Sequence, residues 1–380
     1  MKIGYDGKRA VQNHTGLGNY SRYVIEALND HYPQQEYLLY APKRRENPRL
    51  DALLQDGNGR ISLHFPKGWW RRLSALWRIY GMRKQVEKDG VALFHGLSNE
   101  LPLNIQQFKG VKSIVTIHDL IFLRLPHCYK TIDRLIYNYK FRRACQYADR
   151  IIAVSECTKR DITLFYGIAE EKIEVIYQGC DPAFSQQVDD EKKAEVSKRY
   201  HLPEKFILSV GTIEERKNTL LAVEALEKLP EEYHLVLVGK ETPYAQKIKE
   251  YIKQAQLEKR VHLLQGVPFA DLPAIYQCAT TFVYPSVYEG FGIPILEALN
   301  SRLPVVAATG SCLEEAGGPH SLYVPPTNAS LMAEAIKETL QPSKRERMVE
   351  EGNKWAARFT KEQMARQTMK CYERVLMNEN

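Results

Sequence analysis

Short apolar runs recur along the chain in two series, and they constrain the fold more than any other feature. The first series lies at 2–5, 37–40, 61–65, 91–95, 113–117, 151–154 and 173–176. The second lies at 206–210, 235–238, 261–264, 281–284, 304–307 and 322–324. Longer helical patterns fill most of the gaps, which is the spacing of βαβ units. The sequence therefore predicts an α/β protein of two doubly wound, Rossmann-like domains that face a central cleft.

The domain boundary is expected in a polar segment between the two series. The chain has 380 residues, whereas one hydrophobic core usually serves no more than about 250–300 residues. We expect a first domain over 1–182, a linker over 183–204 and a second domain over 205–360. A last helix, roughly 361–377, can cross back so that 361–380 completes the first domain.

Composition excludes several other classes of protein. No apolar run reaches the roughly 18 residues that span a bilayer, and the N-terminus lacks the layout of a signal peptide. We therefore expect a cytoplasmic protein. The seven cysteines include no C-x-x-C pair, which favours reduced core thiols over a zinc site or a disulfide framework.

The segment 286–298 carries two carboxylates, Glu289 and Glu297, eight positions apart around a helix start. An apolar strand run precedes it, so Glu289 is predicted on a loop and Glu297 in the first turn of a helix. Pro294 fits the first helical position, where its missing N–H costs nothing. Glycines beside the strand end permit close backbone approach to a ligand, and the helix N-terminus favours an anion such as a diphosphate. The alternative is that Glu297 only complements its own helix dipole and Glu289 is a solvated loop acid.

This pattern resembles the E-x7-E signature of the retaining GT-B glycosyltransferases of family 4, and the resemblance extends over nearly the whole chain. It implies that Glu289 faces hydroxyls of the donor sugar and that Glu297 holds the nucleotide ribose. The sugar and phosphates are then supported by the backbone of Gly290, Phe291, Gly292 and Ile293.

Two adjacent cations, Arg216 and Lys217, follow the first strand run of the second half. At the carboxyl end of that strand they can neutralise charge that develops on a leaving diphosphate during sugar transfer. Many family relatives carry an arginine directly after the strand glycine, where this chain has Thr212. The alternative is a pair of solvated residues at a helix start.

Three further segments join the predicted site through the resemblance. His118 follows a strand and matches the histidine that contacts the donor sugar, although a lone histidine there is more often structural. Gly16 and Gly18 resemble the family's first glycine-rich loop, which comes close to donor and acceptor. Their stretch fails the dinucleotide-binding fingerprint because the third glycine is missing. Gly266 and Val267 are expected to pass the nucleotide base, mostly through backbone groups.

The expected chemistry is metal-independent hexosyl transfer with retained anomeric configuration. No D-x-D sequence occurs, so a metal-bridged diphosphate is not suggested and no cofactor is expected beside the nucleotide-sugar donor. The diphosphate leaves and the acceptor hydroxyl attacks on one face, with Glu289 as an orienting group rather than a nucleophile. The segments 211–218 and 15–20 look most like bacterial mannosyltransferases of polysaccharide assembly, which implies GDP-mannose and a glycan or lipid-linked acceptor.

Three alternatives to this function are a UDP-sugar-dependent transferase of the same fold, a sugar-nucleotide epimerase and a non-enzymatic glycan- or nucleotide-sugar-binding partner. An epimerase would lack an acceptor surface. A non-enzymatic partner would have lost a site residue, and the five charged or imidazole candidates are all intact. No nucleic-acid partner is expected.

A basic stretch at 66–84 predicts docking of the first domain on an anionic membrane surface, which would make the protein peripheral on the inner face of the cell membrane. The net charge of +7 favours anionic lipid, and 134–143 can lie beside the stretch. The alternative is that Trp70 and Trp77 pack on the sheet and the arginines are a solvated face. The side chains expected to make the contact are those of Trp69, Trp70, Arg71 and Arg72.

Overall fold

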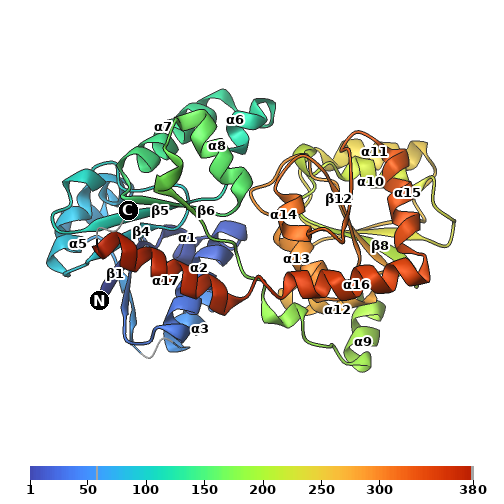
Figure 1. Ribbon diagram of the computed structural model, residues 1–380, viewed down its shortest axis with the longest axis horizontal. Helices are drawn as coiled ribbons and strands as arrows, with labels where there is room; N and C mark the ends of the chain where they lie inside the picture. Colours follow the sequence, from blue (N-terminus) through green and yellow to red (C-terminus); the bar gives the residue numbers. More distant parts are fainter. Residues whose placement is uncertain (57–58, 378–380) are drawn as a thin grey trace. The chain divides into compact units, whose positions relative to one another are not determined.

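A computed structural model describes residues 1–56 and 59–377, and the chain divides into two compact units. The first unit comprises Met1–Gly179 with Lys361–Asn380, of which 378–380 lie outside the described residues, and the second comprises Cys180–Thr360. Each unit is a parallel sheet flanked by helices (Figure 1). The predicted fold class is confirmed, and every predicted strand run matches an observed strand within two residues at each end.

The first unit contains a seven-stranded sheet of order β3-β2-β1-β4-β5-β6-β7. Ile3 of β1 lies opposite Tyr37 of β2 and Leu93 of β4, so the strand order reverses between β1 and β4. The strands are β1 Lys2–Asp6, β2 Glu36–Tyr40, β3 Ile61–His64, β4 Leu93–Gly96, β5 Lys112–Ile117, β6 Arg150–Ala153 and β7 Ile173–Val175. The helices are α1 Lys8–Gln12, α2 Gly16–His31, α3 Pro48–Asp56, α4 Ser74–Leu76, α5 Arg83–Lys88, α6 Ile121–Arg124, α7 Thr131–Tyr147, α8 Glu156–Tyr166 and α17 Lys361–Met377.

The second unit contains a six-stranded sheet of order β10-β9-β8-β11-β12-β13, with the reversal between β8 and β11. Its strands are apolar and buried because helices cover a parallel sheet on both faces. They are β8 Phe206–Val210, β9 His234–Val238, β10 Val261–Leu264, β11 Thr281–Tyr284, β12 Val305–Ala308 and β13 Leu322–Val324. The helices are α9 Asp190–Tyr200, α10 Thr219–Leu226, α11 Ala245–Gln254, α12 Leu272–Cys278, α13 Ile293–Asn300, α14 Leu313–Gly317, α15 Ala329–Thr339 and α16 Pro342–Ala356.

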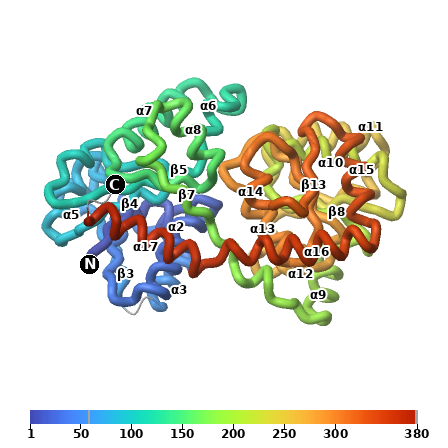
Figure 2. Tube along the Cα trace, in the orientation of Figure 1, coloured from blue at the N-terminus to red at the C-terminus, as the bar shows by residue number. Residues whose placement is uncertain are grey.

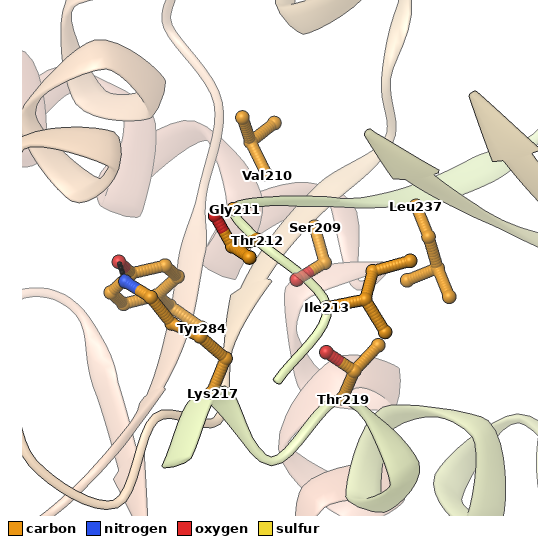
Figure 3. A pocket seen from close by; sticks show the side chains of 9 residues that line it. All are labelled: Ser209, Val210, Gly211, Thr212, Ile213, Lys217, Thr219, Leu237 and Tyr284. Carbon is orange, nitrogen blue, oxygen red and sulfur yellow. Dashed lines mark hydrogen bonds between the residues drawn. The ribbon is translucent and has the colours of Figure 1, made fainter. Parts of the chain in front are cut away.

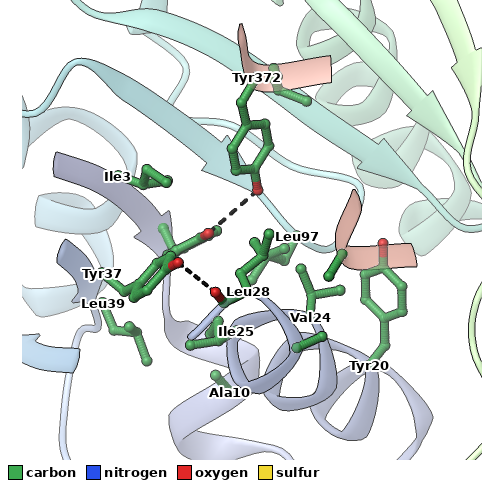
Figure 4. Close-up of a cluster of buried hydrophobic side chains, with 14 of the residues drawn as sticks. Ile3, Ala10, Tyr20, Val24, Ile25, Leu28, Tyr37, Leu39, Leu97 and Tyr372 are labelled. Atoms are coloured by element: carbon green, nitrogen blue, oxygen red, sulfur yellow. Dashed lines mark hydrogen bonds between the residues drawn. The ribbon is translucent and has the colours of Figure 1, made fainter. Parts of the chain in front are cut away.

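Helix α17 packs on α2 of the first unit, far from it in sequence (Figure 2). Its Tyr372 is fully buried, with the hydroxyl 3.4 Å from that of Tyr5 and 2.6 Å from Nδ1 of His95. In the same core the Tyr37 hydroxyl donates to the Leu28 carbonyl at 2.7 Å (Figure 4). The end of the chain therefore completes the core formed by its beginning.

Half of the polar segment 183–204, which was expected as a linker, is helix α9 of the second unit. Helix α9 packs on α12, and its Val196 is fully buried. Lys192 and Arg199 of α9 pair with Asp271 at 3.1 and 2.7 Å. The polar composition of this segment led to the prediction of a linker, because α9 buries only one narrow stripe and leaves the rest of its surface to solvent.

The basic stretch at 66–84 is a series of short segments, η1 Gly68–Arg71, α4, η2 Trp77–Gly81 and the start of α5. Trp69 is 63% exposed, but Trp77 is only 2% exposed, and Trp70 packs against the same core. Trp70 can therefore offer only part of its side chain to the membrane contact that was expected. None of the helices within 1–56 and 59–377 has the length and apolar composition needed to cross a bilayer.

The turn before α2 is built on a close backbone approach. The Asn13 carboxamide oxygen accepts from the N–H groups of Thr15 and Gly18 at 2.7 and 3.3 Å. A Cβ at Gly18 would lie 2.1 Å from the Asn13 carbonyl oxygen, whereas a Cβ at Gly16 would meet nothing within 4 Å. The backbone packing therefore requires glycine at position 18 but not at position 16.

We expect Gly18→Ala to lower the free energy of unfolding by about 1–3 kcal/mol, because backbone must move to admit the methyl group. Gly16→Ala is the matched control, two positions away at the start of the same helix. It should leave stability unchanged or raise it by up to about 1 kcal/mol, since alanine favours helix. Urea denaturation followed by circular dichroism measures both, and equal effects would contradict this account of the turn.

Candidate functional site

The topological switch point of the second sheet lies between β8 and β11. Ligands of open α/β sheets bind outside the carboxyl ends of the strands at such a point. The chain leaves β8 into the turn Glu215–Lys217 and leaves β11 into the loop that carries Glu289. Both segments singled out in the sequence therefore lie at the place where this fold binds ligands.

Hydrogen bonds tie the turn to the loop. Val287 N–H donates to the Arg216 carbonyl at 2.9 Å, and Arg216 Nη1 donates to the Tyr288 carbonyl at 2.7 Å. Asn218, with a left-handed φ of 52°, donates its side-chain N–H to the Pro285 carbonyl at 3.2 Å. The two segments form one structure, which fixes the cations relative to the carboxylate.

The Glu289 carboxylate pairs with both cations through a single oxygen. Its Oε1 lies 2.6 Å from Lys217 Nζ and 2.9 Å from Arg216 Nη1. The Tyr284 hydroxyl is 2.6 Å from Lys217 Nζ and 3.3 Å from the same oxygen. Glu289 is 9% exposed, so the alternative of a solvated loop acid is wrong, and so is that of two solvated cations.

Electrostatics keep all three charges in place. Burial by itself raises the pKa of Glu289, but Lys217 and Arg216 outweigh it and lower that pKa to about 2. Burial lowers the pKa of each cation, and the Glu289 carboxylate reverses this so that both pKa values stand above their ordinary range. Arg216 also pairs with Glu214 at 2.7 Å, so two carboxylates balance the two cations of the cluster.

A small pocket opens beside the cluster, at the carboxyl end of β8 (Figure 3). Lys217 and Tyr284 lie side by side on one wall of it. The backbone of Gly211, whose φ is 156°, passes close to the Lys217 side chain. Its other lining residues are Ser209, Val210, Thr212, Ile213, Thr219 and Leu237.

The glycine-flanked segment after Glu289 ends in helix α13. Gly292 is the N-cap with φ 123°, a conformation that side chains rarely adopt, and Pro294 is the second helical residue rather than the first. The ring of Phe291 is buried 5.7 Å from that of Phe359, so only its backbone can face a ligand. The N–H groups of the first turn of α13 are therefore the part of this loop that is suited to an anion.

Glu297 lies in the second turn of α13, not in the first as predicted, because the helix begins at Ile293. Its Oε2 accepts a hydrogen bond from the Tyr276 hydroxyl at 2.7 Å. Burial raises the pKa of Glu297 to about 7, although the Tyr276 bond opposes this. A carboxyl group one turn inside the helix cannot simply complement the helix N-terminus, and its shifted pKa marks a candidate functional group.

His118 belongs to the first unit, directly after β5, where it is 6% exposed. Its backbone N–H donates to Asn99 Oδ1 at 2.7 Å, and its Nε2 lies 2.9 Å from the Leu97 carbonyl oxygen. Burial lowers the pKa of His118 to about 4, so the ring is neutral at pH 7. Because a carbonyl only accepts, Nε2 carries the proton and Nδ1 is left as an acceptor.

A buried polar network stands behind His118. The Tyr20 ring meets the imidazole edge-on at 4.5 Å, and the Tyr20 hydroxyl lies 3.4 Å from Thr116 Oγ1. Nε2 of His95 lies 2.8 Å from that same oxygen, and its Nδ1 contacts Tyr372 of α17. The position of His118 is therefore linked to the C-terminal helix.

The other predicted residues lie on separate loops. Gly16 and Gly18 begin α2 of the first unit. Gly266, with φ 66°, and Val267 follow β10, which β9 separates from β8 in the sheet. The structure thus joins Arg216, Lys217 and Glu289 directly and leaves the base-contacting role of 266–267 as a prediction.

Sequence reasoning missed the partners that hold these groups. Tyr284 is the last residue of a strand that ends at the site, and this position in the sequence could have identified it as a site residue. Tyr20 lies within the stretch that carries the glycines. Tyr276 and Asn99 come from neighbouring elements whose contact with Glu297 and His118 only the tertiary structure shows.

Two family models and several known proteins match this chain. The family model "Glycosyltransferase Family 4" matches residues 15–184, and "Glycosyl transferases group 1" matches residues 190–355. The O-antigen chain mannosyltransferase B of Escherichia coli is 29% identical over 287 residues, 74% of each chain. The O-antigen chain mannosyltransferase RfbU of Salmonella typhimurium is 27% identical over 228 residues, 60% of each chain.

Solved structures share the architecture at low sequence identity. Sucrose-phosphate synthase from Thermosynechococcus elongatus superimposes with a TM-score of 0.78 at 20% identity over 100% of both chains. HepE of Anabaena, in complex with UDP and glucose, gives a TM-score of 0.76 at 18% identity over 98% of this chain and 99% of that one. Together the two family models account for most of both units, and the chain therefore belongs to the family 4 glycosyltransferases, with their GT-B fold.

Proposed function

We propose that this glycosyltransferase moves mannose from GDP-mannose to a glycan or lipid-linked acceptor during synthesis of a cell-surface polysaccharide. The observation that carries the proposal is the Glu289, Arg216 and Lys217 cluster at the switch point of the second sheet. Two fixed cations beside a firmly ionised carboxylate suit a donor that presents a diphosphate and sugar hydroxyls together.

Lys217 and Arg216 neutralise the diphosphate as it leaves. Both stay protonated at neutral pH, and both are held in place by a shared partner before the donor arrives. Preorganised cations are worth more to a transition state than mobile ones, because no reorganisation occurs during the reaction. The N-terminus of α13 supplies further N–H donors, so the proposed transfer needs no metal ion.

Glu289 orients the sugar and does not attack it. Its carboxylate remains ionised and already accepts hydrogen bonds, so it can accept further ones from sugar hydroxyls. The acceptor hydroxyl attacks on the face that the diphosphate leaves, and a leaving phosphate oxygen helps to take its proton. The anomeric configuration is then retained. His118, neutral and with Nδ1 free to accept, receives a hydrogen bond from a sugar hydroxyl.

The choice of mannose rests on the relatives, which include O-antigen mannosyltransferases of two enteric bacteria. A UDP-sugar donor is the second candidate, because HepE of the same fold was crystallised with UDP and glucose. In either case Glu297 holds the ribose, which every nucleotide shares. The base then passes Gly266 and Val267, mostly beside their backbone groups.

Turnover tests the cluster. Glu289→Ala and Lys217→Ala should each lower turnover by about a hundredfold or more, because each removes a charge that acts on the transition state. Glu215→Ala is the matched control: it removes an exposed carboxylate from the same turn and should leave turnover unchanged. Near-normal turnover of folded Glu289→Ala protein would remove the central assignment.

The same assay examines the metal-free mechanism. Chelator should leave turnover of the wild-type protein intact, since cations of the chain replace the metal. Restoration of lost activity by added manganese would refute this part of the proposal without touching the roles of Glu289 and Lys217.

Donor binding tests the base and the ribose contact. Calorimetry should show GDP binding more tightly than UDP, and the same order in Glu297→Ala protein at weaker affinity, because the ribose is common to both. Since the pKa of Glu297 is about 7, its carboxylate form, the better acceptor for ribose hydroxyls, prevails above pH 7. Affinity should therefore fall between pH 8 and pH 6.

Glu297→Gln separates this effect from the titration of the ligand. The phosphate groups of GDP titrate equally with both proteins, so the steeper loss of affinity in the wild type reports Glu297 alone. Equal slopes would remove the ribose assignment. Tighter binding of UDP than GDP would sink the mannose proposal and leave the reaction class untouched.

A further inference from the structure

Helix α7 is apolar on two opposite faces. Its inner face packs into the core of the first unit through Phe141, Ala144 and Cys145. Its outer face carries a second apolar stripe at the i, i+3, i+4, i+7 spacing of one helix face. The side chains of this stripe are Ile132, Leu135, Ile136 and Tyr139, which are 62%, 61%, 44% and 56% exposed.

Such a stripe is unusual on a protein surface. Single exposed apolar residues need no explanation, but contiguous ones mark a surface that meets a partner or a membrane. The outer face of α7 is therefore the part of the first unit most in need of a covering partner.

Basic side chains accompany the stripe. The helix contains four basic residues, Arg134, Lys140, Arg142 and Arg143, against one acidic residue, Asp133. The Arg143 guanidinium lies 4.6 Å from the centre of the Tyr147 ring and 6.0 Å from that of Tyr139. Cations and tyrosines at the margin of an aliphatic stripe are the composition of helices that lie in a bilayer interface.

The exposed part of the 66–84 stretch adjoins α7. The Arg143 guanidinium donates to the Leu103 carbonyl at 2.9 Å, and the Leu103 N–H donates to the Ile79 carbonyl at 3.0 Å. Glu100 pairs with Lys140 of α7 at 3.4 Å and with Arg78 of η2 at 2.9 Å. Here too large apolar side chains are exposed, namely Trp69, Leu73, Leu76 and Tyr80.

We propose that the outer face of α7, together with the exposed side chains of 69–80, docks the first unit on an anionic lipid bilayer, with α7 lying in the interface. The ion pairs of the described residues do not include Arg71 or Arg72, which are both exposed, so these guanidinium groups can meet lipid phosphates. A second copy of the chain fits this surface poorly, because its like charges would be brought together.

This proposal differs from the sequence-based expectation in its principal contact. The tryptophans were expected to carry the docking, but Trp77 is buried and Trp70 is partly buried in the core. The α7 stripe supplies the continuous apolar face that the short segments around Trp69 lack. Docking would bring the first unit to a lipid-linked acceptor, but it depends neither on the donor nor on the reaction.

Liposome flotation of the full chain tests the proposal. Wild-type protein should float with vesicles of phosphatidylglycerol and phosphatidylcholine in low salt and stay at the bottom with phosphatidylcholine alone. The triple variant Ile132→Gln, Leu135→Gln, Tyr139→Gln should lose at least about tenfold in the floated fraction, because the apolar face no longer enters the interface. The variant Arg71→Glu with Arg72→Glu should float less than wild type, and its residual binding should be less sensitive to salt.

Leu331→Gln is the matched control, since it replaces a 39% exposed leucine on α15 of the second unit. It should float as the wild type does. Circular dichroism and binding of a nucleoside diphosphate establish that each variant is folded. Wild type that stays at the bottom of the gradient, or a triple variant that floats normally, would overturn the proposal. Wild type that fails to float and sediments as a dimer, with a monomeric triple variant, would assign the stripe to a second copy.

Discussion

The site depends on one carboxylate that holds two neighbouring cations. Arg216 and Lys217 are adjacent in sequence and repel each other, and burying both would be costly without a counter-charge. Glu289 provides it through a single oxygen, and the Lys217 hydrogen bond to Tyr284 fixes the ammonium group from the side. Glu214 pairs with Arg216 as well, and the two cations held in this way are the groups beside the pocket at β8 that suit a diphosphate.

The parallel sheet puts these groups in one place. Arg216 follows β8 and Glu289 follows β11, which lie far apart in sequence but next to each other at the reversal of strand order. The first unit repeats the principle with β1 and β4, and His118 follows the next strand, β5. A network of buried hydroxyl and imidazole groups extends from His118 to Tyr372. Helix α17 therefore helps to hold His118 at the carboxyl end of β5.

The first unit has two sets of apolar surface, and its own fold covers only one of them. Both faces of its sheet are covered by helices, including α17, while the outer stripe of α7 and the side chains near Trp69 remain exposed. A sugar transferase that acts on a lipid-linked acceptor has a use for such a surface. The proposed donor site in the second unit is built from charges and hydrogen bonds, so the two surfaces can be altered independently.

The sequence by itself determined the fold class, the strands and the residues of the charged cluster, Arg216, Lys217 and Glu289. Buried parallel strands appear in a sequence as short apolar runs, and these residues lie in the loops that follow such runs. It misjudged α9 as a linker, since a helix with one buried stripe is polar in composition. It also placed Glu297 a turn too early and could not show which tryptophans were buried. Tyr276, Asn99 and Tyr372 were beyond its reach, because their roles come from contacts across 19 to 277 positions of sequence. Only the tertiary structure decides such contacts, since they depend on how separate elements pack and not on any local pattern.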